Sequence, residues 1–167
     1  MRKAPYLLIG LIVLVIDQIT KAMVLRFIPL GGGREITPWF SIIHWQNPGG
    51  LFGMMNQLPS VARVGVFLLL PLLGIALLGF LFAKSRRRIE WILLSAVLGG
   101  ALGNMVDRFR FGSVVDFLDF HLPGGPAWPT FNVADAFLST GILLYLALVL
   151  LRPEPEGERA PDSLHHR

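Results

Sequence analysis

The sequence contains no cysteine, and charged residues make up only 16% of its 167 positions. The first absence excludes disulfide bonds, thiolate metal sites and a cysteine nucleophile. The second is unusual for a small soluble domain, which needs surface charge to stay dispersed. Hydrophobic residues instead reach 53%, and the mean hydropathy is +0.60. A bilayer is therefore the better solvent for this chain.

Four stretches are apolar enough to cross a hydrocarbon core, which takes about 20 residues of helix. They are residues 6–27, 61–83, 91–106 and 133–151. We therefore expect an all-α membrane protein with a single four-helix domain over residues 1–152. The Pro/Glu-rich tail, residues 153–167, is expected to be disordered.

The basic residues indicate orientation rather than nucleic-acid binding, although the net charge is +4. They cluster beside apolar stretches, at ends that a four-span chain places on one side: residues 2–3, 84–88 and 152. The positive-inside rule assigns that side to the cytoplasm. Both termini are then cytoplasmic, and residues 28–60 and 107–132 face outward.

The first outer segment carries the signals of a small sheet. A run of three glycines at residues 31–33 indicates a turn, and residues 39–45 are rich in β-branched and aromatic side chains. Such a run predicts one or two short strands. Aromatic residues also suit the membrane interface, so we expect this sheet to lie on the outer membrane surface.

Polar residues inside the spans are costly in lipid and usually mark function. Asp17 and Lys21 are four residues apart on the first span and can pair on one helix face. Two interpretations stay open at this point. The pair is either a salt bridge that lets two charges enter the bilayer, or a direct contact with substrate.

The third span carries small residues at helical spacing, Ala96 and Gly100, with Gly99 and Gly103 alongside. This pattern lets another helix approach closely. The same face continues into three polar residues, Asn104, Asp107 and Arg108. Close packing explains the glycines but not the polar residues, so we expect chemistry at the outer end of this span.

Two acids follow on the outer side. Asp116 lies in the mostly apolar run 114–120, and Asp135 lies where the fourth helix begins, with Asn132 as a candidate N-cap. Two carboxylates in one apolar site cannot both ionise easily, so the pair can act as general base and general acid on a water molecule. If residues 114–120 are helical rather than extended, Asp119 is an alternative partner for Asp135.

Other catalytic schemes have weaker support. His44 and His121 are isolated and lack metal-ligand spacing, so we expect neither metal nor cofactor. No Gly-x-Ser-x-Gly motif is present. Spacing alone leaves a Ser/Lys pair open.

Five blocks of the sequence, taken in order, carry a family resemblance. They are Asp17-Gln18-x-x-Lys21, Asn47-x-Gly49 with Phe52, Gly103-Asn104-x-x-Asp107-Arg108, Val114-Val115-Asp116-Phe117 and Phe131-Asn132-x-Ala134-Asp135. Together they resemble lipoprotein signal peptidase, also called signal peptidase II, an aspartic peptidase family. The resemblance covers about residues 17–137, with the four spans correctly interleaved.

The resemblance implies a plasma-membrane (inner-membrane) endopeptidase that removes the signal peptide from bacterial prolipoproteins, cutting just before the diacylglyceryl-modified cysteine. Asp116 and Asp135 would be the catalytic dyad, near the outer leaflet. The residues implied to shape the site and hold the substrate are Asp17, Lys21, Asn47, Gly49, Asn104, Arg108 and Asn132. An outer β-cradle and a short mobile periplasmic helix are implied for residues 31–60. The expected partners are prolipoproteins and membrane lipids, and the expected state is a monomer.

One block departs from the family pattern, because Pro48, Gly50 and Leu51 replace residues that include two alanines before Phe52. Proline and glycine change the freedom of this loop, which bears on substrate preference and inhibitor binding. Two other function classes remain as alternatives. One is a small transporter with an Asp17/Lys21 relay, and the other is a non-enzymatic scaffold.

Overall fold

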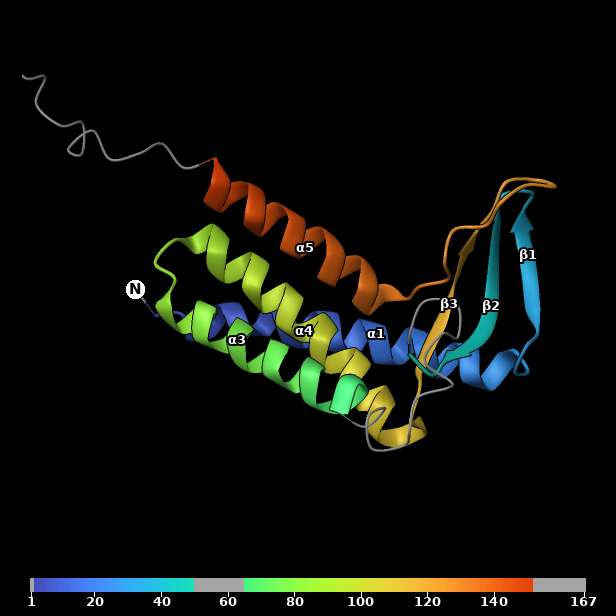
Figure 1. Ribbon diagram of the computed structural model, residues 1–167, viewed down its shortest axis with the longest axis horizontal. Coiled ribbons are helices and arrows are strands. Elements are labelled where there is room, and N and C mark those ends of the chain that lie inside the picture. Colours follow the sequence, from blue (N-terminus) through green and yellow to red (C-terminus); the bar gives the residue numbers. More distant parts are fainter. Residues whose placement is uncertain (1, 50–64, 152–167) are drawn as a thin grey trace, which may run out of the picture.

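The structure is a computed structural model that describes residues 2–49 and 65–151. Four long helices form a bundle, with a small sheet across one end (Figure 1). The helices are α1 (Leu7–Phe27), α3 (Leu70–Lys84), α4 (Arg88–Phe111) and α5 (Val133–Leu150). Short helical turns precede two of them, a 3-10 turn at Ala4–Tyr6 before α1 and a π-helical turn at Gly65–Leu69 before α3.

Each of the four helical segments is long and apolar enough to cross a membrane. This confirms the expected four-span membrane protein. Both ends of the third span differ from the expectation: it was expected over about residues 91–106 but runs from Arg88 to Phe111. Hydropathy falls at Asp107 and Arg108, but the helix continues past them. It ends at Phe111, where Gly112 in a left-handed conformation (φ 69°) forms the C-cap. Both polar residues therefore lie on α4 and not in the outer loop.

The sheet has three antiparallel strands in the order β1-β2-β3. They are β1 (Gly33–Thr37), β2 (Phe40–Asn47) and β3 (Val114–Phe120). The first two form a hairpin where one or two short strands of a small sheet were expected, and the third comes from the connection between α4 and α5. Since β3 is extended, Asp116 and Asp119 point to opposite faces of the sheet. This answers the question that the sequence left open for residues 114–120.

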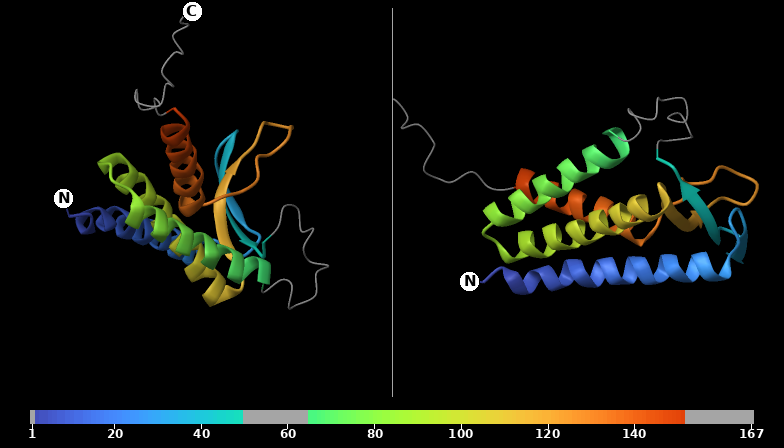
Figure 2. Two further views of the ribbon diagram at one scale, coloured as in Figure 1. Left: turned by 60° about the vertical axis from the view of Figure 1, so that its left-hand side comes forward. Right: turned by 90° about the horizontal axis from the view of Figure 1, so that it is seen from below.

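Helix α4 lies at the centre of the bundle and packs against α1, α3 and α5 (Figure 2). A side chain on Gly99 would overlap the backbone of Gly10 on α1. A Cβ on Gly100 would lie 2.6 Å from the carbonyl oxygen of Ala134 on α5. The small-residue face of α4 therefore brings both neighbouring helices close, and this fixes the distances between the polar groups that they carry.

A small apolar cluster of Val24, Val115 and Phe117 packs β3 against the C-terminal end of α1. Residues 31–49 contain the hairpin. The rest of the segment in which a short periplasmic helix was expected lies outside the described residues, and so does the expected disordered tail.

Candidate active site

Asp116 lies on β3 with only 2% of its surface exposed. Its Oδ1 accepts a hydrogen bond from Asn132 Nδ2 at 2.7 Å, and its Oδ2 accepts one from Asn47 Nδ2 at 3.0 Å. Asn47 is oriented in turn, because its own Oδ1 accepts from the backbone N–H of Gly49 at 2.9 Å. Gly49 has a φ of +96°, a conformation that favours glycine and explains this residue of the Asn-x-Gly block.

Asp135 lies in the first turn of α5, as the sequence predicted. Asn132 caps this helix by accepting from the Asp135 N–H at 2.9 Å, and Asp135 Oδ2 accepts from the Asn132 N–H at 3.3 Å. The other carboxylate oxygen, Oδ1, accepts from Asn104 Nδ2 at 2.7 Å. Asn132 thus bonds to both Asp116 and Asp135, which we call the acid pair. Asp135 therefore takes part in the N-terminal capping of α5 and also belongs to the acid pair.

The environment of Asp116 favours a retained proton. Burial, followed by the nearby charge of Asp135, raises the pKa of Asp116 to about 7, against the lowering effect of its two amide donors. An acid pair of this kind binds one proton near neutral pH, and the proton belongs to the pair rather than to either residue.

Lys21 joins α1 to α4 beneath the acid pair and is only 2% exposed. Its ammonium lies 2.9 Å from Asp17 Oδ2, 2.8 Å from Asp107 Oδ2 and 3.0 Å from Asn104 Oδ1. A lysine has three protons to donate, so these three acceptors satisfy the buried group completely. The predicted pairing with Asp17 is confirmed. Because both residues are buried and Lys21 is fully bonded, the geometry favours a salt bridge over substrate contact, and over a Ser/Lys catalytic pair at Lys21.

The carboxylates of Asp17 and Asp107, which both contact Lys21, also accept hydrogen bonds from the backbone next to the acid pair. Asp17 Oδ1 accepts from the N–H of Ala134 at 2.9 Å, and Asp107 Oδ2 accepts from the N–H of Val115 at 3.1 Å. Each of these N–H groups belongs to the residue directly before one member of the acid pair. One buried ammonium therefore holds together the supports of both acids.

Two further polar side chains complete the surroundings. Arg108 is half-buried and donates to the Asn104 carbonyl at 3.4 Å, and its charge acts on both members of the acid pair. Gln18 Nε2 lies 3.2 Å from Asp107 Oδ1 and 3.2 Å from Asp17 Oδ2. Gln18 and Asp107 were quoted in the sequence blocks but not assigned to the site. Their positions in charged motifs inside spans were the only signal that could have assigned them.

Asp119 does not join the acid pair. It lies on the opposite face of β3 and its carboxylate pairs with His121 Nδ1 at 3.1 Å. His44 is buried on β2 with its Nδ1 2.8 Å from the carbonyl oxygen of Ile28. Within residues 2–49 and 65–151, no group of three His, Asp or Glu side chains is arranged to hold a metal ion.

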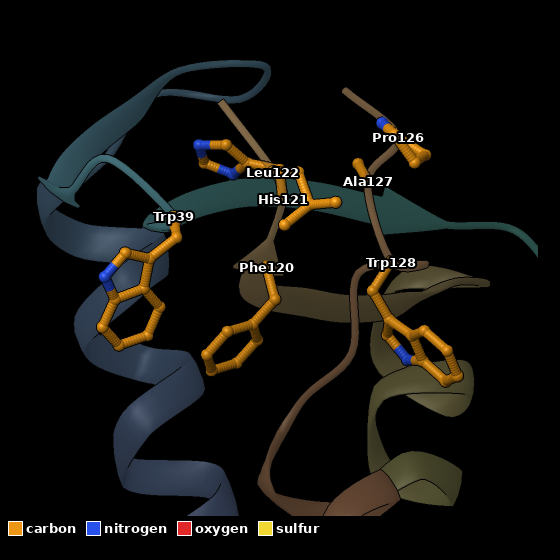
Figure 3. Close-up of a pocket in the computed structure, with 7 residues that line it drawn as sticks. All are labelled: Trp39, Phe120, His121, Leu122, Pro126, Ala127 and Trp128. Atoms are coloured by element: carbon orange, nitrogen blue, oxygen red, sulfur yellow. The ribbon is translucent and has the colours of Figure 1, made fainter. Parts of the chain in front are cut away.

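A separate hollow of about 410 Å³ lies at the outer tip of the sheet (Figure 3). The rings of Trp39, Phe120 and Trp128 all point to its helix-facing side, and Trp39 stacks on Phe120 with ring centroids 6.2 Å apart. The acid pair does not line it. This hollow is an aromatic surface feature, distinct from the candidate active site.

The chain is similar to known proteins of one family. A family model described as signal peptidase (SPase) II matches residues 9–151. The lipoprotein signal peptidase of Moorella thermoacetica is 39% identical over 158 residues, which cover 94% of this chain and 99% of that protein. That of Thermodesulfovibrio yellowstonii is 36% identical over 135 residues, or 81% of this chain and 87% of that protein.

A solved structure described as a bacterial membrane enzyme superposes with a TM-score of 0.79 at 27% identity, covering 90% of this chain and 95% of that one. A second structure with the same description gives a TM-score of 0.77 at 26% identity, covering 95% of each chain. These matches lend no support to the transporter alternative. With its matching family model and close relatives, the chain belongs to the signal peptidase II family.

Proposed function

We propose that this chain is an aspartic endopeptidase that cleaves bacterial prolipoproteins just before the diacylglyceryl-modified cysteine, with Asp116 and Asp135 as its catalytic residues. The observation that carries the proposal is the acid pair itself. Two carboxylates from separate elements accept hydrogen bonds from Asn132, Asp116 from its side-chain amide and Asp135 from its backbone N–H, and the pKa of Asp116 is raised to about 7. Such a pair holds one proton where the reaction needs both an acid and a base.

The proposed reaction has two steps. The ionised carboxylate takes a proton from a bound water, whose oxygen attacks the scissile carbonyl carbon, while the protonated carboxylic acid gives its proton to the carbonyl oxygen. The resulting tetrahedral diol then breaks its C–N bond. The carboxyl group that took a proton from water donates it to the leaving nitrogen, and the other carboxylate takes a proton from one diol hydroxyl, whose oxygen becomes the new carbonyl oxygen. The products are a signal peptide with a free carboxyl end and a lipoprotein with a free amino group. No covalent bond to the enzyme forms.

The surrounding polar residues would act by positioning. Asn47, Asn104 and Asn132 donate to the carboxylates and fix where their lone pairs point. Asp17 and Asp107 hold the backbone just before each acid, and Lys21 links them. Arg108 supplies positive charge next to the pair, where negative charge develops on the attacked carbonyl. The cost of misplacing such groups is large, because a shift of about 1 Å can slow a reaction about 100-fold.

We further propose that both termini are cytoplasmic and that the site works near the outer leaflet as a monomeric unit of residues 1–152. The N-terminus and the α3–α4 connection lie at the end of the bundle opposite the sheet (Figure 1). Both segments are basic, with Lys3 in the first and Lys84 and three arginines in the second. Lys3 Nζ donates to the carbonyl of Ala83 at 2.6 Å, so the N-terminal segment and the α3–α4 connection share one side. The positive-inside rule makes this side cytoplasmic.

The test uses purified protein in detergent with a diacylglyceryl-modified prolipoprotein, resolved on a gel. The wild type should release the signal peptide, and Asp116→Asn and Asp135→Asn should each abolish release, because the two acids act as one unit. Asp119→Asn is the matched control and should remain active. Cleavage by Asp116→Asn beside an inactive Asp119→Asn would show that the wrong aspartate had been chosen.

A further inference from the structure

Trp45 of β2 lies directly opposite Asp116 of β3 in the antiparallel pairing. Side chains of directly opposed residues lie on the same face of a sheet, with Cβ atoms about 4.5–5.5 Å apart. Asn47 supports this assignment independently. It is two residues further along the same strand, hence on the same face, and its side chain donates to Asp116 Oδ2.

A bulge in β2 is what brings Trp45 to this position. Ile42 pairs with Leu118, but the next recorded pair is Trp45 with Asp116, so β2 contains one residue more than β3 over this interval. In an unbroken register, His44 would lie opposite Asp116. Bulges re-aim side chains next to functional sites. Here His44 is turned into the interior against the Ile28 carbonyl, and an indole takes the place beside the carboxylate.

The indole is 52% exposed, whereas the Asp116 side chain next to it is buried. Among the described residues, the aromatic contacts of the sheet join Trp39, Phe40, Phe120 and Phe131 and leave Trp45 out. The ring therefore makes no aromatic contact within the sheet that would account for its presence. A half-exposed indole is a large, rigid apolar surface that gains free energy when a ligand covers it.

From these observations we propose that Trp45 forms an aliphatic-binding subsite beside the catalytic carboxylates. It would contact an apolar group of the substrate next to the scissile bond. Two groups share this chemistry: an acyl chain on the modified cysteine, and an apolar side chain of the signal peptide just before it. The inference rests on the proposed function, since it takes Asp116 as the group that meets the scissile bond.

The test compares Trp45→Ala and Trp45→Phe with the wild type in steady-state cleavage of a lipid-modified precursor. Trp45→Ala should raise KM about tenfold with kcat within about twofold, as expected for loss of apolar contact remote from the bond change. Trp45→Phe should recover most of the loss. Trp39→Ala and Trp128→Ala are matched controls, because these tryptophans are 54% and 71% exposed but lie at the aromatic hollow (Figure 3). They should leave KM unchanged.

Two substrate series identify the aliphatic group. If the acyl chain is bound, the effect of Trp45→Ala should shrink when the two acyl chains are shortened. If the side chain is bound, it should shrink when the residue before the cysteine is changed from leucine to alanine. Either result supports the subsite, and an effect that neither series changes overturns it, as does an unchanged KM.

Stability is checked by the melting temperature, and Trp45→Gln replaces the alanine variant if that variant melts early. Gln keeps an extended side chain but removes the apolar ring face, and the same tenfold rise in KM is expected. An inactive wild type would contradict the proposed function itself. An active wild type whose Trp45 variants behave normally would contradict the subsite alone.

Discussion

Asp116→Asn should make the protein inactive and, above neutral pH, more stable. The pKa of Asp116 is raised from 3.8 to about 7, first by burial and then by the charge of Asp135. A raised carboxyl pKa means that the folded state prefers the protonated acid. The stability that this preference provides is complete below about pH 4 and is lost as the pH rises through about 7. An asparagine does not titrate, so the variant should not suffer this loss.

The size of the effect follows from the shift. Each pKa unit corresponds to about 1.4 kcal/mol, so ionising Asp116 costs the fold at most about 4 kcal/mol by pH 8. The replacement also loses something, because both carboxylate oxygens accept hydrogen bonds from amides and an asparagine has a single acceptor oxygen. That loss is about 1 kcal/mol. The variant should therefore be close to the wild type near pH 4–5 and more stable by roughly 2–3 kcal/mol at pH 8.

The assay is the melting temperature of purified wild type and variant in one detergent, measured from pH 4.5 to 8.5. The difference in melting temperature should widen with pH and level off above 7. Asp119→Asn is the comparison variant, because this acid lies on the opposite face of β3, outside the acid pair. A constant difference between the two proteins across the whole range would refute a raised pKa at Asp116.

Three further predictions test other parts of the argument. A reporter fused after Arg152 should behave as cytoplasmic and one inserted near Gly32 as external; the reverse pattern would move the acid pair to the other side of the membrane. Cleavage should persist with metal chelators and with serine- or thiol-directed reagents, because the acid pair supplies both acid and base; loss restored by zinc would contradict it. Asp107→Ala removes the acceptor for the Val115 N–H, whereas Asp107→Asn keeps an oxygen there. We expect kcat to fall about 100-fold in the alanine variant and about tenfold in the asparagine variant, with KM little changed. Equal losses in both would show that the charge and not this hydrogen bond matters.

The features that the sequence predicted correctly are local. The pairing of Asp17 with Lys21 needs only one helical turn, and the capping of α5 by Asn132 with Asp135 in its first turn needs only the helix start. The close approach at Gly99 and Gly100 follows from spacing on one helix face. In each case the partners, or the pattern that demands them, lie within a few residues.

The extended conformation of residues 114–120 could not be decided in this way. Val114 to Phe120 is mostly apolar, so neither a helical nor an alternating period stands out in it. The strand forms because β2, some 70 residues earlier in the chain, offers a free edge for pairing. The end of α4 was misplaced for a related reason. A hydropathy scale counts Asp107 as unfavourable inside the membrane. The free-energy cost of burying a charge is much smaller when that charge is paired inside a helix bundle.

The arrangement around Lys21 shows why a site of this kind cannot be predicted from sequence patterns alone. Of its three partners, only Asp17 is near in sequence; Asn104 and Asp107 come from α4. Burying one ammonium with two carboxylates leaves a net negative charge in a membrane domain, and backbone N–H groups help to stabilise it. These N–H groups belong to Ala134 and Val115, so satisfying the buried charge also fixes the backbone before each member of the acid pair. The same hydrogen bonds thus serve two physical demands, which explains why charges so costly to bury are placed beneath the acid pair.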